Sequence, residues 1–150
     1  MNFVHNYGVI HRDIKPSNLI RREDGRIFLI DFGAVKLLQP QQENKTIAIA
    51  TPGYAPMEQI AGQPKINCDI YALGMVAIQA LTDVEPTEFL RNRDTGKLIL
   101  PDSTNTNSRD WRELAPLSNE LAAILDKMVI VNFTKRYQSA TEVLKSLESL

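Results

Sequence analysis

The stretch GVIHRDIKPSN, residues 8–18, concentrates ionisable and amide side chains in a short run. Its chemically active members are His11, Arg12, Asp13, Lys15 and Asn18. A second acidic motif, Asp31-Phe32-Gly33, begins thirteen residues after Asn18. If the chain between the two motifs forms a hairpin, its open end brings Asp13, Asn18 and Asp31 together beside Lys15. Oxygen ligands of this kind suit a hard cation such as Mg²⁺ that carries phosphates.

A hairpin is what the intervening residues predict. Residues 19–22 and 26–30 are short strand-like runs, and Glu23-Asp24-Gly25 between them contains Asp-Gly, a strong hairpin signal. Upstream, residues 3–7 predict the end of a helix stopped by Gly8. Downstream, residues 34–50 are polar and predict a long loop.

The second half of the chain predicts helices. Residues 69–82 are rich in Ala, Leu and Met and apolar around most of the circumference, which indicates a buried helix. Residues 93–118 predict an irregular excursion. A helix over 119–131 and a capping box at 139–142, which opens a last helix, follow. We therefore expect an α+β fold, mostly α-helical, in one compact unit.

Composition excludes several classes of protein. The chain has 150 residues, 17 basic and 18 acidic, so its charge gives no general attraction to nucleic acid or to an anionic membrane. The apolar run IYALGMVAIQAL, residues 70–81, is too short to span a bilayer, and the N-terminus does not resemble a signal peptide. The single cysteine, Cys68, allows no intrachain disulfide, which fits a cytoplasmic setting, and it is expected to be a small apolar filler.

Read together, HRDIKPSN and DFG resemble the catalytic loop and magnesium loop of eukaryotic-type protein kinases. Residues 50–59, 69–74 and 135–140 resemble later segments of that family in the same order. The residues in these motifs are most similar to those of bacterial, especially cyanobacterial, serine/threonine kinases. The resemblance covers essentially the whole chain. It implies that residues 1–150 are a partial kinase domain, the C-terminal large lobe from the catalytic loop to the last helix.

The resemblance implies a role for each residue of the first two motifs. Asp13 would accept or orient the proton of the substrate hydroxyl, and Lys15 would neutralise charge on the transferred phosphoryl group. Asn18 and Asp31 would hold Mg²⁺, with ATP as the phosphate donor. The resemblance also implies that Thr51 bonds to both Asp13 and Lys15. This pattern implies a protein substrate with a Ser or Thr acceptor.

It also implies residues that support and regulate the site. Arg12 would bind a phosphate on Thr46, although Thr46 could equally be an ordinary polar loop residue. Asp69 would brace the backbone of the catalytic loop, and His11 would pack beneath Asp31.

A further pair, Glu58 and Arg136, would form a buried ion pair that holds residues 50–59 to the helical part. The sequence departs mildly from the family pattern there. Residues 56–58 read Pro-Met-Glu in place of Ala-Pro-Glu, and Ala50 stands in place of Gly.

The larger departure is the absence of small-lobe motifs. None of the seven glycines are spaced as G-x-G-x-x-G requires, and Val76-Ala77-Ile78-Gln79 ends in Gln where V-A-I-K needs Lys. We therefore expect the N-terminal lobe to be absent, apolar area of the helix over residues 70–81 to be exposed, and the isolated chain to bind and turn over little nucleotide. A separate chain, a split gene or a misplaced start codon could account for the missing lobe. The alternatives are a non-catalytic interaction module and a truncated gene remnant.

Overall fold

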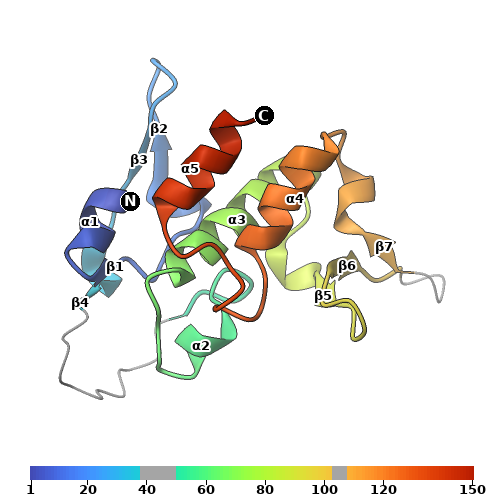
Figure 1. Ribbon diagram of the computed structural model, residues 1–150, viewed down its shortest axis with the longest axis horizontal. Helices are drawn as coiled ribbons and strands as arrows, with labels where there is room; N and C mark the ends of the chain where they lie inside the picture. Colours follow the sequence, from blue (N-terminus) through green and yellow to red (C-terminus); the bar gives the residue numbers. More distant parts are fainter. Residues whose placement is uncertain (38–49, 103–107) are drawn as a thin grey trace.

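The computed structural model describes residues 1–37, 50–102 and 108–150 (Figure 1). In these ranges the α-helices are α1 (Asn2–Asn6), α2 (Met57–Ile60), α3 (Cys68–Thr82), α4 (Asn119–Met128) and α5 (Ala140–Glu148). The strands are β1 (Val9–Ile10), β2 (Leu19–Arg21), β3 (Ile27–Leu29), β4 (Lys36–Leu37), β5 (Leu90–Arg91), β6 (Leu98–Leu100) and β7 (Arg109–Asp110). Short 3₁₀ turns are η1 (Pro16–Asn18), η2 (Phe32–Ala34), η3 (Pro86–Glu88) and η4 (Trp111–Leu114).

Helix α3 forms the centre of the molecule, as its apolar sequence predicts. It runs between α1 and the β2–β3 hairpin on one side and the β5–β6–β7 sheet on the other (Figure 1). Met75 and Ile78 on α3 are fully buried in one apolar cluster that includes Trp111 of η4 and Leu125 of α4. One continuous core therefore joins the central helix to the C-terminal half.

The contact between α3 and α4 is unusually close at Gly74. A Cβ atom at this position would lie 2.7 Å from Cγ1 of Val129 and 2.9 Å from Cβ of Met128. Both distances are shorter than van der Waals contact allows, so only glycine fits without a shift of the neighbouring helix end. This glycine in a helix interior is explained by packing, which outweighs its poor helix propensity.

Within the described ranges the strands form three small antiparallel sheets. Strand β1 pairs with β4, β2 with β3, and β6 lies between β5 and β7. The predicted hairpin is present, with Leu19 opposite Leu29 and a turn over Glu23, Asp24 and Gly25. Below the hairpin, the Ile30 N–H donates to the Asn18 carbonyl at 2.9 Å, which fixes the two predicted motifs side by side.

The prediction that residues 93–118 are irregular is wrong over residues 98–100 and 109–114. Strands β6 and β7 and turn η4 lie in this range. Polar residues that suggested a loop instead end and cap these elements. Asn92 Oδ1 accepts the N–H groups of Asp94 and Thr95 in the β5–β6 turn, and Asp110 caps η4 through the Arg112 N–H.

Serine caps begin both C-terminal helices. Ser118 accepts the Leu121 N–H, and Ser139 accepts the Glu142 N–H at 3.2 Å. The capping box predicted at 139–142 is only half formed, because the Glu142 carboxylate accepts from the Gln138 N–H.

Helix α4 ends at Met128, earlier than the predicted residue 131. The following carbonyls bind arginine side chains: Val129 accepts from Arg91, and Ile130 and Val131 accept from Arg136.

The exposed apolar side chains are not where the sequence led us to expect them. Among the large apolar residues of α3, only Leu81 is exposed, because α4 and η4 cover the helix. Many of the exposed large apolar residues lie on α1, the hairpin and α5: Phe3, Ile20, Ile27, Phe28, Leu144 and Leu147. Others lie elsewhere, among them Met57 and Ile60 on α2 and Leu90 on β5. No helix in the described ranges is both long and apolar enough to cross a membrane.

We expect Gly74→Ala to lower the free energy of unfolding by about 1–2 kcal/mol, because overpacking outweighs the roughly 1 kcal/mol that Ala contributes to a free helix position. Urea denaturation of the single and double variants measures this. Val129→Ala should cost less in the Gly74→Ala background than alone, since it removes the clashing methyl group. A Gly74→Ala variant more stable than the parent would contradict the close-packing account.

Candidate active site

The carboxylate of Asp69, in the first turn of α3, holds the backbone of the stretch 8–18. Its Oδ2 atom accepts the His11 N–H and its Oδ1 atom accepts the Arg12 N–H, both at 2.9 Å. Arg12 has a φ of 69°, a left-handed conformation that costs a non-glycine residue of order 1–3 kcal/mol. Two buried, charge-assisted hydrogen bonds offset that cost and fix the backbone conformation that orients the Asp13 side chain.

His5 completes the environment of Asp69, and sequence reasoning missed it. Its Nε2 atom lies 2.8 Å from Oδ2 of Asp69, and both side chains are buried. His5 belongs to α1, so this contact ties the N-terminal helix to α3. Only the fold reveals the contact, because His5 and Asp69 are 64 residues apart and no local pattern links them.

Asp13 lies in a compact cluster with Lys15 and Thr51. The Lys15 ammonium is 2.9 Å from Oδ2 of Asp13 and 3.3 Å from the Thr51 hydroxyl. The Thr51 hydroxyl donates to Oδ1 of Asp13 at 2.6 Å. Two residues of the first motif and one that follows it by more than 30 positions therefore share one hydrogen-bonded group.

Partial burial alone would raise the pKa of Asp13. Hydrogen bonds from Lys15, Thr51 and Asn18, with the positive charge of Lys15, outweigh that effect and lower the pKa below its ordinary value. Asp13 is therefore a carboxylate at neutral pH. Its charged form is stabilised at pH values above the ordinary pKa, and this contribution is lost only as the pH falls through the lowered value.

Asn18 is buried next to Asp13. Its amide nitrogen donates to the Asp13 carbonyl oxygen at 2.8 Å and to Oδ2 of the same residue at 3.0 Å. Both bonds use the nitrogen, so the amide oxygen is the atom that Asn18 can offer to a cation.

Asp31 stands at the end of the hairpin, where Ile30 pairs with Asn18. It is exposed, has a φ of 61°, and uses Oδ1 to accept the Gly33 N–H at 3.1 Å. A Cβ atom on Gly33 would lie 3.0 Å from that same oxygen, so a glycine here leaves room for the carboxylate.

Asn18 and Asp31 fit a Mg²⁺ ion held largely by substrate phosphates. The described residues contain no cluster of three or more His, Cys, Asp or Glu side chains that could hold a metal by themselves. Magnesium in phosphate-transfer sites typically takes only one or two protein oxygens and completes its shell with phosphates and water. An amide oxygen and a carboxylate on adjoining segments match that donor set.

His11 is fully buried and contacts both neighbours of Asp31. Its Nε2 atom lies 3.1 Å from the Ile30 carbonyl oxygen, and its ring meets the edge of Phe32 with centroids 4.8 Å apart. These contacts are those of a packing residue between the two motifs.

Arg12 is also buried, and Gln59 of α2 donates to its carbonyl oxygen at 2.7 Å. The Nε atom of Arg12 donates to the carbonyl of Ala34, just beyond Asp31. Burial lowers the pKa of the guanidinium, and the charge of Asp69 opposes that shift. Thr46, the expected phosphate carrier, lies outside the described residues.

Glu58 and Arg136 form an ion pair 2.8 Å long, with the side chain of Arg136 completely inaccessible. Arg136 also donates to the Asn67 carbonyl, directly before α3. Cys68 lies beside the pair, its sulfur 3.5 Å from Oε1 of Glu58. Burial raises the pKa of the Cys68 thiol to about 12, so the thiol is neutral and behaves as the expected apolar filler.

Comparison with known proteins matches residues 1–147 to the family model described as protein kinase domain. The chain is 38% identical to serine/threonine-protein kinase B of Synechocystis sp. and to serine/threonine-protein kinase PknA of Nostoc sp., in each case over 99% of this chain and 26% of the relative. It is 29% identical to serine/threonine-protein kinase PknD of Chlamydia pneumoniae, over 99% of this chain and 18% of the relative. The chain thus spans about a quarter or less of the length of these relatives.

We expect Glu58→Gln to lower the free energy of unfolding by about 3–5 kcal/mol, because it leaves the Arg136 charge buried without its counterion. Urea denaturation at pH 7 measures the loss. The matched control is Lys97→Gln, which breaks an exposed pair with Asp110 at 3.8 Å and should cost less than about 0.5 kcal/mol. Equal losses in the two variants would contradict the supporting role of the buried pair.

Proposed function

The chain belongs to the protein kinase family, and we propose that it forms the large lobe of a serine/threonine protein kinase. The reaction is transfer of the ATP γ-phosphate to Ser or Thr hydroxyls of a protein substrate. The observation that carries the proposal is the cluster of Asp13, Lys15 and Thr51, with Asn18 bonded to the same carboxylate. An ionised carboxylate, a cation and a metal-binding oxygen in one group suit phosphoryl transfer.

In this proposal Asp13 accepts or orients the proton of the incoming hydroxyl. Its lowered pKa keeps it ionised at neutral pH, and the Thr51 and Lys15 bonds hold its oxygens in fixed directions. Lys15 has a side chain about one quarter exposed, so its ammonium can turn toward a bound phosphoryl group. Positioning supplies most of the rate in such reactions, and Asp69 provides the rigid base for it.

Asn18 and Asp31 would hold Mg²⁺, whose role is to neutralise charge on the ATP phosphates. The buried position of Asn18 fixes its oxygen, and the exposed carboxylate of Asp31 leaves room for a ligand. The hydrogen bond between Ile30 and Asn18 keeps the two residues on adjoining segments.

A small lobe is required for this activity, supplied by a separate chain or a preceding segment. The 150 residues contain no glycine-rich phosphate loop and no V-A-I-K lysine, so the phosphates and the adenine lack a cover. Without it, water weakens every charge interaction at the site, and the isolated chain turns over little ATP. DNA upstream of the Met1 codon that encodes both motifs would support this reading, and their absence would favour a non-catalytic interaction module or a gene remnant.

Thr46 is the proposed control point, with Arg12 as the receiver of its phosphate. The Arg12 backbone N–H donates to Asp69, and its side chain donates to the Ala34 carbonyl. A phosphate on Thr46 that bound the Arg12 guanidinium would therefore also stabilise the segment that carries Asp31. Mass spectrometry should find the phosphate on Thr46, and Thr46→Ala should reduce activity. Unmodified Thr46 with unchanged activity in the variant excludes this control.

The decisive test of function is phosphate transfer from labelled ATP to casein by the chain joined to a small lobe. Asp13→Asn should lower that rate by about 10²–10⁴-fold, because the proton acceptor is lost. Asp24→Asn, on the exposed hairpin turn, should leave it unchanged. Transfer by the isolated chain that depends on Asp13 would refute the need for a small lobe.

A further inference from the structure

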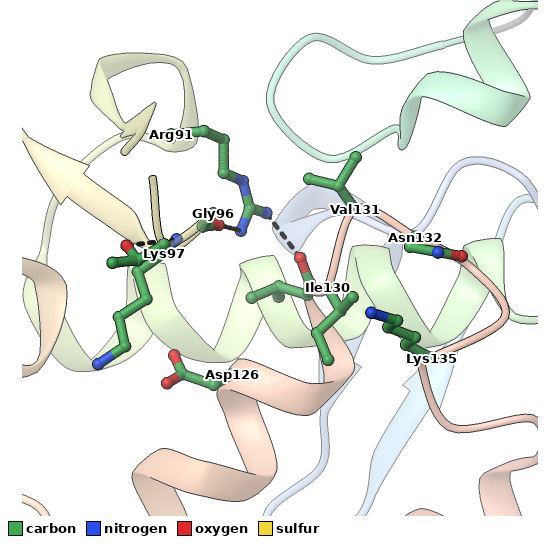
Figure 2. A pocket seen from close by; sticks show the side chains of 10 residues that line it. Arg91, Gly96, Lys97, Asp126, Ile130, Val131, Asn132 and Lys135 are labelled. Atoms are coloured by element: carbon green, nitrogen blue, oxygen red, sulfur yellow. Dashed lines mark hydrogen bonds between the residues drawn. The ribbon is translucent and has the colours of Figure 1, made fainter. Parts of the chain in front are cut away.

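A pocket of about 410 Å³ lies between the β5–β6 turn and the loop that follows α4 (Figure 2). We call it the sheet pocket; its walls are Arg91, Gly96 and Lys97 on one side and Asp126, residues 129–132 and Lys135 on the other. Its volume falls in the range of specific ligand sites. It shares no residue with the Asp13 cluster, and the sheet and the hairpin lie on opposite sides of the molecule (Figure 1).

The charges around the sheet pocket are unbalanced toward positive. Arg91, Lys97 and Lys135 are cationic, and Asp126 is the acidic wall residue. Asp126 is already neutralised, since its carboxylate accepts from Arg112 and from the indole N–H of Trp111. Within the described ranges Lys135 makes no ion pair.

The two lysines stand at the edges of the pocket. Figure 2 shows Lys97 and Lys135 on opposite sides, with Arg91 between them. Lys97 is exposed, and its nearest carboxylate partner, Asp110, lies at a loose 3.8 Å. An acidic ligand can therefore meet the Lys135 ammonium directly and compete with Asp110 for the Lys97 ammonium.

Arg91 is a fixed part of the wall. Its guanidinium donates to the carbonyls of Gly96 at 3.1 Å and Val129 at 2.7 Å, and to the Tyr71 hydroxyl at 3.1 Å. These bonds join the two sides of the pocket through one side chain. A ligand would meet this charge already oriented, which reduces the entropy lost on binding.

An apolar part of the wall, next to the polar Thr95 and Asn132, is equally fixed. Val129, Ile130 and Val131 line it, and their carbonyl groups are held by Arg91 and Arg136. Val131 is 46% exposed, so part of this apolar surface is open to a partner.

We propose that the sheet pocket binds a peptide segment of a protein partner that combines acidic and aliphatic side chains. A small anion alone would gain little, because its pairs with solvated lysines would contribute at most about a few-fold in affinity. An apolar ligand alone would leave the three cations unused. A peptide can place an aliphatic side chain on Val131 and carboxylates toward Lys97 and Lys135, as helical and extended docking peptides do in general.

The test is fluorescence anisotropy of the full chain with a fluorescein-labelled Gly-Leu-Glu-Ile-Glu-Gly peptide at 50 mM and 300 mM salt. The double charge reversal Lys97→Glu with Lys135→Glu should weaken binding about tenfold, and Val131→Ser should also weaken it. Lys145→Glu, a single charge reversal at an exposed site on α5 away from the pocket, is the control and should bind as the parent does. A peptide with both Glu replaced by Gln should bind about three- to tenfold more weakly, because two exposed ion pairs are lost.

The outcomes separate this proposal from the proposed function. No ATP is present in the assay, and Asp13→Asn should bind the peptide normally. A failed kinase test therefore does not contradict peptide binding by the sheet pocket. Equal binding by the double reversal and the parent, or by the Gln peptide, overturns the proposal. Equal weakening by Lys145→Glu and by the double reversal shows only non-specific attraction and overturns it as well.

Discussion

The buried carboxylate of Asp69 is the constraint on which the rest of the site depends. It accepts two backbone N–H groups of the stretch 8–18 and the ring nitrogen of His5. A backbone with Arg12 at positive φ would relax without these bonds. Because Asp13, Lys15 and Asn18 follow directly along this backbone, their directions are set by a residue that has no part in chemistry.

The start of α3 is the place where the separate parts of the chain meet. Asp69 binds the N-terminal stretch. Two residues earlier, the Asn67 carbonyl accepts from Arg136, which in turn pairs with Glu58 of α2. The Asn67 side chain adds a bond to the Phe133 carbonyl. Breaking any one of these buried polar contacts leaves a group without its partner, so the arrangement is rigid. A rigid base of this kind is what catalysis by positioning requires.

How much the sequence could predict depends on the range of the interaction involved. Local signals were sufficient for α3, for the β2–β3 hairpin and for the serine cap of α5, since each depends on nearby residues. The β5–β6–β7 sheet was not predicted, because its strands are two or three residues long and its polar turn resembles a loop. The contact of His5 with Asp69 and the bonds of Arg91 across the sheet pocket join residues distant in sequence. The family resemblance implied that Thr51 bonds to both Asp13 and Lys15, and the structure shows these two hydrogen bonds with their distances.

Native-state hydrogen exchange of the His11 and Arg12 amides in Asp69→Asn tests the central claim most directly. An asparagine has one accepting oxygen and one donating nitrogen, so it can serve only one of the two backbone N–H groups. The account predicts that at least one of these amides exchanges about tenfold faster or more than in the parent, while amides in the middle of α3 keep their protection. Unchanged exchange at both amides would show that the loop holds its conformation without Asp69, and would contradict the account.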